Sequence, residues 1–250
     1  MLRNFKLHIE NDYAALSQKA AEILAKAIEL NPTAAFGFAT GSTPVGTYEA
    51  LINMQNAGKA DLTRLTAFNL DEYYPIKPSN SQSYEYFMRK NLFDAIGLPA
   101  FNTFIPSGET KDPQAECAAY DEKIARAGGI EMQILGIGNN GHIGFNEPAQ
   151  NLMATTSCIA LAQDTIDANA RFFDSADEVP RHALTMGMHS ILMAKRIILL
   201  ASGEGKAEII REALQGPITT MVPASLLQLH RDVTVVLDKA AAKLLSWIPN

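Results

Sequence analysis

Short apolar runs alternate with longer segments of helical periodicity along almost the whole chain. In the longer segments, apolar residues recur every three or four positions, which is typical of amphipathic helices. The shorter runs are continuously apolar, which favours buried strands. The predicted strands are Ala34 to Ala39, Leu65 to Leu70, Glu131 to Ile137, Arg196 to Ala201 and Asp232 to Leu237. The predicted helices are Asp12 to Leu30, Tyr84 to Ala95, Pro113 to Arg126, Ala183 to Ala194, Gly205 to Leu214, Ala224 to Leu229 and Lys239 to Ser246. A further helix is predicted after the turn at residues 40–44, running through Tyr48, Leu51, Ile52 and Met54.

These strands are expected to form one parallel sheet. Strands that are apolar on both sides are typical of sheets covered on both faces, and the alternation of strand and helix favours parallel pairing. The sequence therefore predicts a single α/β domain over residues 1–250, with a Rossmann-like, parallel-dominated sheet and helices on both faces. One stretch, Asn151 to Pro180, is polar and only weakly periodic and departs from the alternation.

The overall composition limits the classes of partner. Of the 250 residues, 47% are hydrophobic and 19% are charged, which is ordinary for a globular protein. A formal net charge of −6 argues against nucleic acid or an anionic membrane surface as a partner. The N-terminus lacks the apolar core of a signal peptide, and no apolar stretch reaches the roughly 20 residues of a membrane helix. Two cysteines without metal-ligand spacing, Cys117 and Cys158, add to an expectation of the cytoplasm.

The most informative stretch follows the predicted strand that ends at Ile137. Glycines recur through residues 136–144 around a histidine, His142, and a carboxylate, Glu147, follows five positions later. Histidine suits proton transfer near neutral pH, and a nearby carboxylate fixes its tautomer and raises its basicity. Asn140 and Asn146 add hydrogen-bonding groups on either side. Since open α/β sheets bind ligands at such strand ends, His142 is a candidate proton-transfer residue, with a structural or solvated histidine as the alternative.

The same stretch gives little support for a cofactor. Gly136 to Gly141 matches the G-x-G-x-x-G string of dinucleotide-binding proteins, but it lies mid-chain and a polar segment follows where the helix should begin. No second histidine lies at metal-ligand spacing from His142. The other histidines are His8, His182, His189 and His230. We therefore expect neither a nucleotide cofactor nor a metal.

A second candidate site is the turn Thr40-Gly41-Ser42-Thr43-Pro44, between a predicted strand and a predicted helix. Gly41 permits close approach to the backbone, and the free N–H groups of a helix N-terminus bind anions. The hydroxyl groups of Ser42 and Thr43 add further donors. An ordinary capped turn explains the same residue types, because Ser and Thr cap helices and Pro suits the first turn.

Two carboxylates, Asp71 and Glu72, follow the predicted strand Leu65 to Leu70. Side chains at this position face the ligand crevice in this class of fold. Either carboxylate can serve as a general base, most usefully with a pKa raised by partial burial. A helix N-cap or a solvated turn is the alternative, since Asp is common in turns.

Two cations, Arg171 and Lys206, are candidate phosphate ligands. Lys206 begins a predicted helix after the strand that ends at Ala201. A cation is unfavourable at a helix N-terminus, and a bound phosphate would offset this. Arg171 lies in the stretch Asn169 to Phe173, within the weakly periodic segment. For each cation taken alone, a solvated surface position remains the simpler interpretation.

Together, these motifs resemble those of the glucosamine-6-phosphate deaminase family, also described as glucosamine/galactosamine-6-phosphate isomerases. The resemblance covers nearly the whole chain and keeps the family's order of motifs. The matching segments are Ala39 to Pro44, Phe68 to Tyr73, Gly138 to Pro148, Asn169 to Phe173 and Ser202 to Ala207. It implies an isomerising hydrolase that converts glucosamine 6-phosphate and water into fructose 6-phosphate and ammonia. No metal or organic cofactor is implied, and the partner is a small amino-sugar phosphate.

The resemblance also implies a role for each candidate residue. His142 would move the proton that opens the pyranose ring, with Asn140 and Glu147 tuning it. Asp71 would take the proton from C2 of the open sugar and return it at C1, before ammonia leaves C2. The implied phosphate-binding residues are Gly41, Ser42, Thr43, Arg171 and Lys206. Residues 151–180 resemble the family's lid, and their few large apolar side chains favour the low local stability that a moving cover requires.

Two alternatives differ in chemistry. The 6-phosphogluconolactonases share the fold and a G-x-G-x-x-G-H turn, but their pattern continues towards Ser-Leu-Phe-Pro, whereas this chain continues from Ile143 to Pro148 and keeps Asp71 and Glu72. A non-catalytic sugar-phosphate sensor could lose its base and its histidine and would carry a DNA-binding module. This chain has both Asp71 and His142, and no segment resembles a helix-turn-helix. The deaminase interpretation is favoured over both.

The chain lacks cations where larger family members bind an allosteric N-acetylated amino-sugar phosphate. Those cations lie just beyond the Asn-Glu-Pro motif, and residues 149–161 contain no Lys or Arg. We therefore predict no activation by N-acetylglucosamine 6-phosphate, and a monomer or small homo-oligomer. Deaminase assays with and without this effector check the prediction, and a clear fall in the apparent KM for substrate would contradict it.

Asn140 stands where many relatives carry an aspartate beside the histidine. An amide can orient an imidazole by hydrogen bonding, but it cannot stabilise the imidazolium form as a charge does. We predict that Asn140→Asp moves the acid limb of the pH–rate profile to higher pH, because the added carboxylate favours the charged imidazole of His142. Profiles of kcat/KM against pH for the two proteins measure this, and an unmoved limb would refute it.

Overall fold

The main sheet contains seven strands. In the computed structural model, which describes residues 5–163, 166, 173 and 178–246, the strand order is β1-β10-β9-β6-β2-β3-β5. Every neighbouring pair is parallel. The strands are β1 (Phe5–Glu10), β2 (Ala35–Phe38), β3 (Thr66–Asn69), β5 (Thr103–Phe104), β6 (Ile130–Leu135), β9 (Arg196–Ala201) and β10 (Val233–Asp238). This confirms the predicted α/β architecture with a parallel-dominated sheet.

A second, smaller sheet is antiparallel and has the order β4-β8-β7. Its strands are β4 (Asp71–Tyr74), β7 (Ser157–Ala160) and β8 (His182–Thr185). Only Leu70 separates β3 from β4, so the chain passes directly from the main sheet into the small one. The Met186 N–H donates to the Leu70 carbonyl at 2.7 Å, which fixes this junction against the segment that follows β8.

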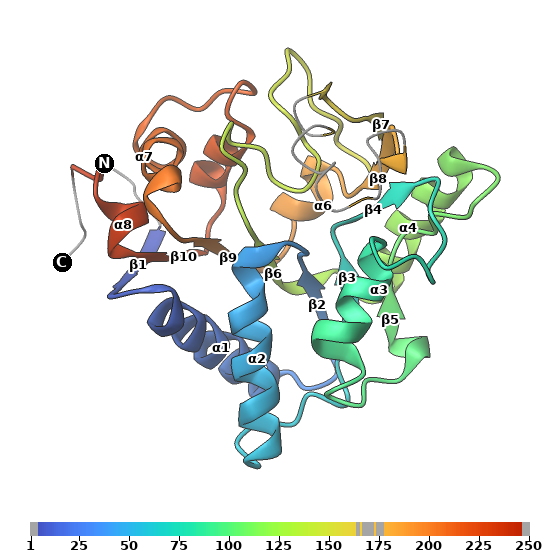
Figure 1. The fold of residues 1–250 in the computed structure, drawn as a ribbon, viewed down its shortest axis with the longest axis horizontal. Coiled ribbons are helices and arrows are strands. Elements are labelled where there is room, and N and C mark those ends of the chain that lie inside the picture. The colour runs from blue at the N-terminus through green and yellow to red at the C-terminus, as the bar shows by residue number, and fades with distance from the viewer. Residues whose placement is uncertain (1–4, 164–165, 167–172, 174–177, 247–250) are drawn as a thin grey trace.

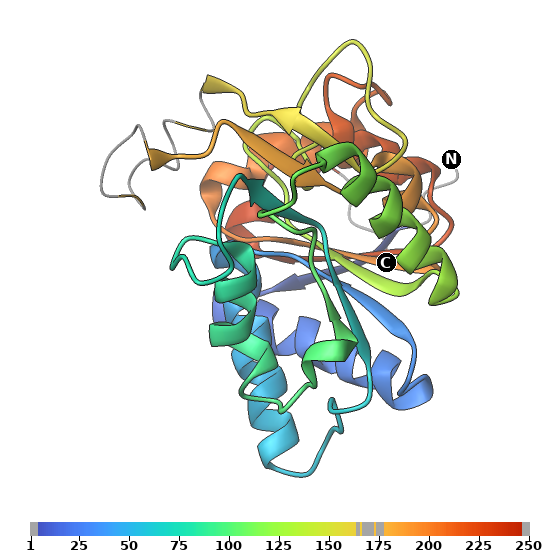
Figure 2. The same cartoon turned by 90° about the vertical axis from the view of Figure 1, so that its right-hand side faces the viewer.

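Helices cover both faces of the main sheet (Figures 1 and 2). Figure 2 shows α1 (Tyr13–Leu30) and α2 (Ser42–Asn56) on one face, and α4 (Pro113–Arg126) with the small sheet on the other. Further α-helices in the described part of the chain are α3 (Tyr84–Met88), α6 (Met188–Leu192), α7 (Ala207–Gln215) and α8 (Lys239–Ala242). Within the described ranges, no helix combines the length and the apolar character needed to cross a membrane.

The starts of α1 and α4 follow from their capping residues. Asp12 caps α1 by accepting a hydrogen bond from the Ala15 N–H at 2.9 Å, and Asp112 caps α4 by accepting from two backbone N–H groups. Pro113 follows at the first helical position, where its missing N–H is not needed. The sequence therefore places both helices through local chemistry, and the apolar faces then attach them to the sheet.

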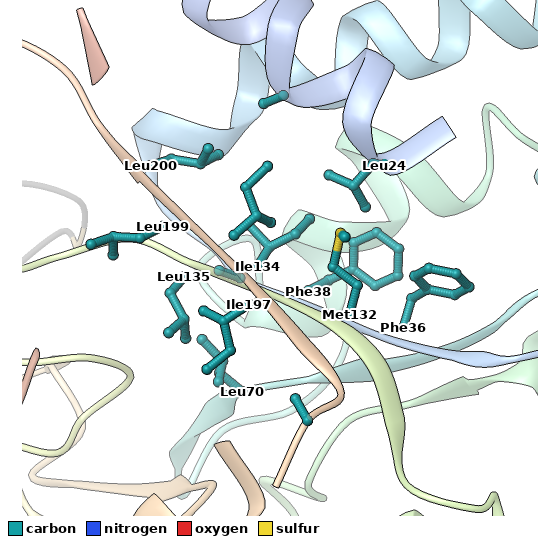
Figure 3. Packing of buried hydrophobic residues seen from close by; sticks show 14 of the residues in the cluster. Leu24, Phe36, Phe38, Leu70, Met132, Ile134, Leu135, Ile197, Leu199 and Leu200 are labelled. Carbon is teal, nitrogen blue, oxygen red and sulfur yellow. The ribbon is translucent and has the colours of Figure 1, made fainter. Parts of the chain in front are cut away.

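The hydrophobic core lies on both sides of the main sheet. Figure 3 shows Leu135 and Ile197 on one side of the central strands and Phe38 and Met132 on the other. Because successive strand residues point to opposite faces, a continuously apolar strand fills both layers. Each large apolar side chain contributes about 1.5–3 kcal/mol on full burial. The strand ends, and the loops that leave them, are thus held by a well-packed core.

The strand order reverses between β2 and β6. From β2 the chain continues to β3 and β5, towards one edge, whereas from β6 it continues to β9 and β10, towards the other edge. In open α/β sheets, ligands bind outside the carboxyl ends of the strands at such a point. The loops that leave β2 and β6 are residues 39–41 and 136–156, which contain two of the motifs identified from the sequence.

The predicted elements of the main sheet are confirmed, whereas the small sheet was missed. The predicted helix Ala183 to Ala194 is wrong in its first part, because β8 occupies His182–Thr185 and only Met188–Leu192 are helical. Residues 71–74, which follow the predicted strand Leu65 to Leu70 and were not predicted as a strand, form β4. These short strands are stabilised by pairing with distant segments, which local periodicity does not reveal. The edge strands β1 and β5 were also not predicted.

Three predicted helices differ in length or type. Tyr84 to Ala95 divides into α3 and a π-helical turn, Arg89–Phe93. Pro223–Leu229 is a 3₁₀ helix, and α8 already ends at Ala242. Helix ends and helix type depend on tertiary contacts as well as on periodicity.

Candidate active site

A cavity of about 520 Å³ lies at the carboxyl ends of β2, β3 and β6. It therefore occupies the point where the strand order reverses. The residues predicted from the sequence that line it are Gly41, Ser42, Thr43, Asp71, Asn140, His142 and Lys206. Residues from four separate motifs thus face one cavity, although up to 165 positions separate them in the chain.

His142 lies on a turn that glycines make possible. The Gly138 N–H donates to the His142 carbonyl, and the Gly141 N–H donates to the Gly138 carbonyl, each at 3.0 Å. Gly141 has a φ of +88°, a conformation that favours glycine. The imidazole lies directly over Gly138, because a Cβ atom at that position would be 2.2 Å from His142 Cε1. The glycines therefore position the ring as well as the turn.

The imidazole of His142 contacts the carboxylate of Glu147. His142 Nδ1 lies 3.1 Å from Glu147 Oε1, an ion-pair distance. The Asn140 amide donates to the other carboxylate oxygen, Glu147 Oε2, at 2.6 Å. The Asn140 side-chain oxygen accepts from the His142 backbone N–H at 3.2 Å. Asn140 thus fixes the carboxylate on the side away from the imidazole, and the carboxylate in turn orients the ring.

This geometry differs from the expectation that Asn140 orients the imidazole itself. The amide acts on the ring through Glu147, because its hydrogen bond goes to that carboxylate. An aspartate at position 140 would place two carboxylates side by side. The two negative charges would together favour the charged imidazole of His142. The predicted shift of the acid limb for Asn140→Asp therefore stays a prediction, but the added charge would act beside Glu147.

The turn that carries Glu147 is anchored next to the small sheet. Asn146 is buried, and its Nδ2 donates to two backbone carbonyls, at 3.0 and 2.9 Å, the second being that of Met186. Thr185 in β8 accepts a hydrogen bond from the Phe145 N–H at 3.0 Å. Asn146 therefore holds the turn, and the small sheet fixes the position of Glu147 relative to the cavity.

Asp71 is a buried carboxylate at the cavity wall. It is the first residue of β4 and only 5% exposed. Burial, together with the charge of neighbouring Glu72, raises the pKa of Asp71 to about 8. Its Oδ2 lies opposite the histidine loop, 3.4 Å from where a Cβ atom on Gly144 would stand. A carboxylate with a raised pKa is a stronger base than an ordinary aspartate, which suits proton abstraction from carbon.

Glu72 points to the other side of β4, where it adds a second cap to the start of α3 beside the N-cap residue Ser83. Its carboxylate accepts hydrogen bonds from the N–H groups of Tyr73 at 2.9 Å, Tyr84 at 2.8 Å and Glu85 at 2.9 Å. Burial raises the pKa of Glu72 to about 7, and these three N–H groups oppose that shift. Successive strand residues face opposite sides. The sequence left a general base and a helix cap open for either carboxylate. In the structure, Asp71 faces the cavity, and Glu72 caps the start of α3.

Tyr84 lines the cavity and was not identified from the sequence. Its ring is parallel to that of Phe145, with a centroid distance of 6.1 Å and an interplanar angle of 1°. Burial raises the pKa of Tyr84 well above that of an ordinary tyrosine, so the phenol stays neutral. No sequence pattern marks this residue, because its place depends on the cap that Glu72 provides.

The N-terminus of α2 opens into the cavity. Gly41 occupies the N-cap position with a φ of +102° and has no side chain with which to cap the helix. The free N–H groups of the first turn and the hydroxyl groups of Ser42 and Thr43 are thus available to a ligand. Such a helix end favours phosphate. The alternative of an ordinary turn capped by Ser42 or Thr43 does not fit, because both residues already belong to the helix.

Lys206 reaches the cavity from the residue before α7. Its ammonium group donates to the Ile137 carbonyl at 2.8 Å and to Asn139 Oδ1 at 2.6 Å. Burial lowers the pKa of Lys206. Asn139, a second residue missed as a site candidate, belongs to the histidine motif and could have been found there. The ammonium group thus stands at the cavity wall, where an anion can contact it.

Arg171 lies outside the described residues. Of the stretch 169–173, the structure describes Phe173, whose ring meets that of Tyr73 edge-on with a centroid distance of 5.9 Å. In the part of the chain that the structure describes, no group of three or more His, Cys, Asp or Glu side chains is placed to hold a metal ion.

Comparison with known proteins agrees with this geometry. Residues 10–236 match the family model of glucosamine-6-phosphate isomerases/6-phosphogluconolactonase. The chain is 52% identical over 237 residues to a glucosamine-6-phosphate deaminase from Halothermothrix orenii, covering 95% of this chain and 98% of that one. It is 50% identical over 240 residues to a glucosamine-6-phosphate deaminase from Clostridium perfringens, covering 96% and 99%.

Solved structures separate the shared fold from the closer relationship. A monomeric glucosamine-6-phosphate deaminase superposes with a TM-score of 0.92 at 44% identity, over 96% of this chain and 99% of that one. The 6-phosphogluconolactonase from Trypanosoma cruzi superposes with a TM-score of 0.79 at 20% identity, over 99% of each chain, which shows a common fold alone. The chain therefore belongs to the glucosamine-6-phosphate isomerase/6-phosphogluconolactonase family, and within it to the group of glucosamine-6-phosphate deaminases.

Proposed function

We propose that this protein converts glucosamine 6-phosphate and water into fructose 6-phosphate and ammonia. The observation that carries the proposal is that Asp71 and His142, from different strand ends, line one cavity. Such a reaction needs one group that exchanges protons with the sugar oxygens and another that moves a proton between neighbouring carbons. The relatives at about half identity, named as deaminases of this substrate, support the same conclusion.

His142 opens the pyranose ring. Opening requires the C1 hydroxyl to lose a proton and the ring oxygen O5 to gain one as the C1–O5 bond breaks. An imidazole accepts the first proton and donates the second near neutral pH. Glu147 lies 3.1 Å from the ring nitrogen and stabilises the charged imidazole during the transfer.

Asp71 then moves a proton from C2 to C1. In the open sugar, the carboxylate takes the C2 proton and the carbonyl at C1 accepts the electron pair that C2 releases. The C1 oxygen gains a proton from the ammonium group at C2, so an enolamine forms. Return of the proton at C1 leaves an imine at C2, to which water adds and from which ammonia leaves. The burial of Asp71 excludes water from the base and raises its basicity.

The phosphate group of the substrate binds at the N-terminus of α2. Gly41, Ser42 and Thr43 supply backbone and hydroxyl donors there, and Lys206 and Arg171 supply positive charge. Binding at this remote group positions C1 and C2 relative to Asp71 and so contributes to the rate as well as to affinity. The reaction uses no metal or organic cofactor.

Residues 151–180, of which 164–165, 167–172 and 174–177 lie outside the described part of the chain, supply a lid within a single domain of residues 1–250. The described start of this segment is fixed in place: Asp121 in α4 accepts hydrogen bonds from the Thr156 N–H at 2.9 Å and from its hydroxyl at 2.5 Å. The polar composition that follows favours low local stability. The protein acts in the cytoplasm as a monomer or small homo-oligomer, and the monomeric state of a deaminase with a similar structure supports the low oligomeric state.

Asp71→Asn should lower kcat for ammonia release by roughly 10²- to 10⁴-fold, because an amide cannot accept the C2 proton. KM should change little, since the phosphate contacts remain. An ammonia-release assay on glucosamine 6-phosphate measures both. Asp94→Asn is the matched control, because the Asp94 side chain is 69% exposed and lies outside the cavity lining.

Glu72→Gln distinguishes the two neighbouring carboxylates. If Asp71 is the base, activity requires its deprotonated form and rises as the pH increases through its pKa. The charge of Glu72 raises that pKa, so Glu72→Gln should keep most of the turnover and move the acid limb of kcat/KM to lower pH. A loss of turnover as large as that of Asp71→Asn would instead make Glu72 the base.

Gly138→Ala should lower kcat more than it changes KM. The new methyl group would occupy the place of the His142 ring, which must move away from the substrate. Gly205→Ala is the matched control, because nothing lies within 4 Å of a Cβ atom there. Steady-state kinetics of both variants test the placement of the ring, and equal kcat values for Gly138→Ala and the parent protein would contradict it.

A further inference from the structure

Tyr13 connects α1 to the first turn of α2, the helix whose N-terminus opens into the cavity. Its hydroxyl accepts a hydrogen bond from the Gly46 N–H at 2.8 Å. The same hydroxyl lies 3.0 Å from the Ser42 carbonyl oxygen and 3.1 Å from the Thr43 carbonyl oxygen, and it donates its single hydrogen to this pair. Tyr13 is 37% exposed, and its hydroxyl nevertheless contacts three backbone groups of α2.

This hydroxyl stands where an α-helix makes its own hydrogen bond. In a regular helix, the N–H of Gly46 points at the carbonyl of Ser42, four residues earlier. The Tyr13 oxygen contacts both groups. A side chain inserted at such a point alters the local course of a helix. Gly46 provides the space, because a Cβ atom there would lie 3.0 Å from the Tyr13 hydroxyl and 2.5 Å from Ser17 Oγ.

The contact fixes the peptide group that carries the Thr43 N–H. The Ser42 carbonyl and the Thr43 N–H belong to one planar trans peptide and point in opposite directions. A donor at the carbonyl end therefore directs the N–H towards the open end of α2, and it polarises the peptide so that the N–H binds anions better. Pro44 has no N–H, so the free backbone donors at this end are those of Gly41, Ser42 and Thr43.

We propose that Tyr13 is a positioning residue for phosphate binding. Its hydroxyl holds the first turn of α2 so that the Thr43 N–H and the hydroxyl groups of Ser42 and Thr43 face the phosphate. The inference rests on the proposed function, which places the substrate phosphate at this helix end. Tyr13 does not line the cavity and acts through α2.

Tyr13→Phe tests this because it removes the hydroxyl and keeps the ring. The KM for glucosamine 6-phosphate and the dissociation constant for inorganic phosphate should rise together by roughly three- to tenfold, the range expected for one lost hydrogen bond. The value of kcat should fall by less than these two constants rise, because the hydroxyl of Tyr13 does not touch the reacting carbons. Steady-state kinetics gives KM and kcat, and calorimetric titration with inorganic phosphate gives the dissociation constant without any turnover.

Two further variants make the result decisive. Tyr86→Phe is the matched control, since Tyr86 is 40% exposed and lies outside the cavity lining, and it should leave all three constants unchanged. Ser42→Ala tests the helix end itself and should weaken phosphate binding. Thermal unfolding midpoints of the three variants report stability separately from binding.

Each outcome decides between the inference and the function on which it rests. If Ser42→Ala weakens phosphate binding and Tyr13→Phe does not, the role of Tyr13 is structural and the inference is overturned, even where the unfolding midpoint falls. A fall in kcat at unchanged phosphate affinity overturns it as well. If neither variant weakens phosphate binding, the phosphate binds elsewhere, and its proposed place at α2 is wrong.

Discussion

The site depends on the divergence of the chain between β2 and β6. Neighbouring parallel strands end at the same edge of the sheet, and here the loops that leave them turn to opposite sides. The resulting crevice receives the open end of α2 from one side and the histidine loop from the other. The packed core beneath keeps these strand ends in register. Side chains that are distant in the chain can thus act on one substrate without being held together by direct contacts.

The small sheet gives this crevice its base and its orientation. β4 continues from β3 after a single residue, so the strand that carries Asp71 leaves the main sheet just where the cavity begins. Successive residues of β4 point to opposite sides, so adjacent carboxylates have different roles. Asp71 faces the cavity, and Glu72 accepts a hydrogen bond from Tyr84, the first residue of α3. The same sheet holds the turn of Glu147 through Thr185. The small sheet therefore fixes both Asp71 and Glu147, the carboxylate that contacts His142.

The sequence predicted the main sheet, the long helices and most of the cavity lining, because these depend on local patterns. Apolar runs marked the strands, and the glycines around His142 marked the loop where a ring must pack on the backbone. It did not predict β8, the division of tasks between Asp71 and Glu72, or the place of Tyr84, because each depends on pairing between distant segments. The contact of Asn140 with Glu147 rather than with the imidazole likewise depends on how the turn folds back.

Burial acts on the two ends of the cavity in opposite senses. It raises the pKa of Asp71 to about 8 and lowers the pKa of Lys206, so each group is shifted towards its neutral form before substrate binds. The proposed substrate carries the complementary charges, a phosphate at one end and an amine at C2. The phosphate favours the charged form of Lys206, and an ammonium group at C2 favours the carboxylate form of Asp71. Binding in the productive orientation thus favours the carboxylate form that the reaction needs, whereas a sugar phosphate without the amine would not oppose the raised pKa of Asp71.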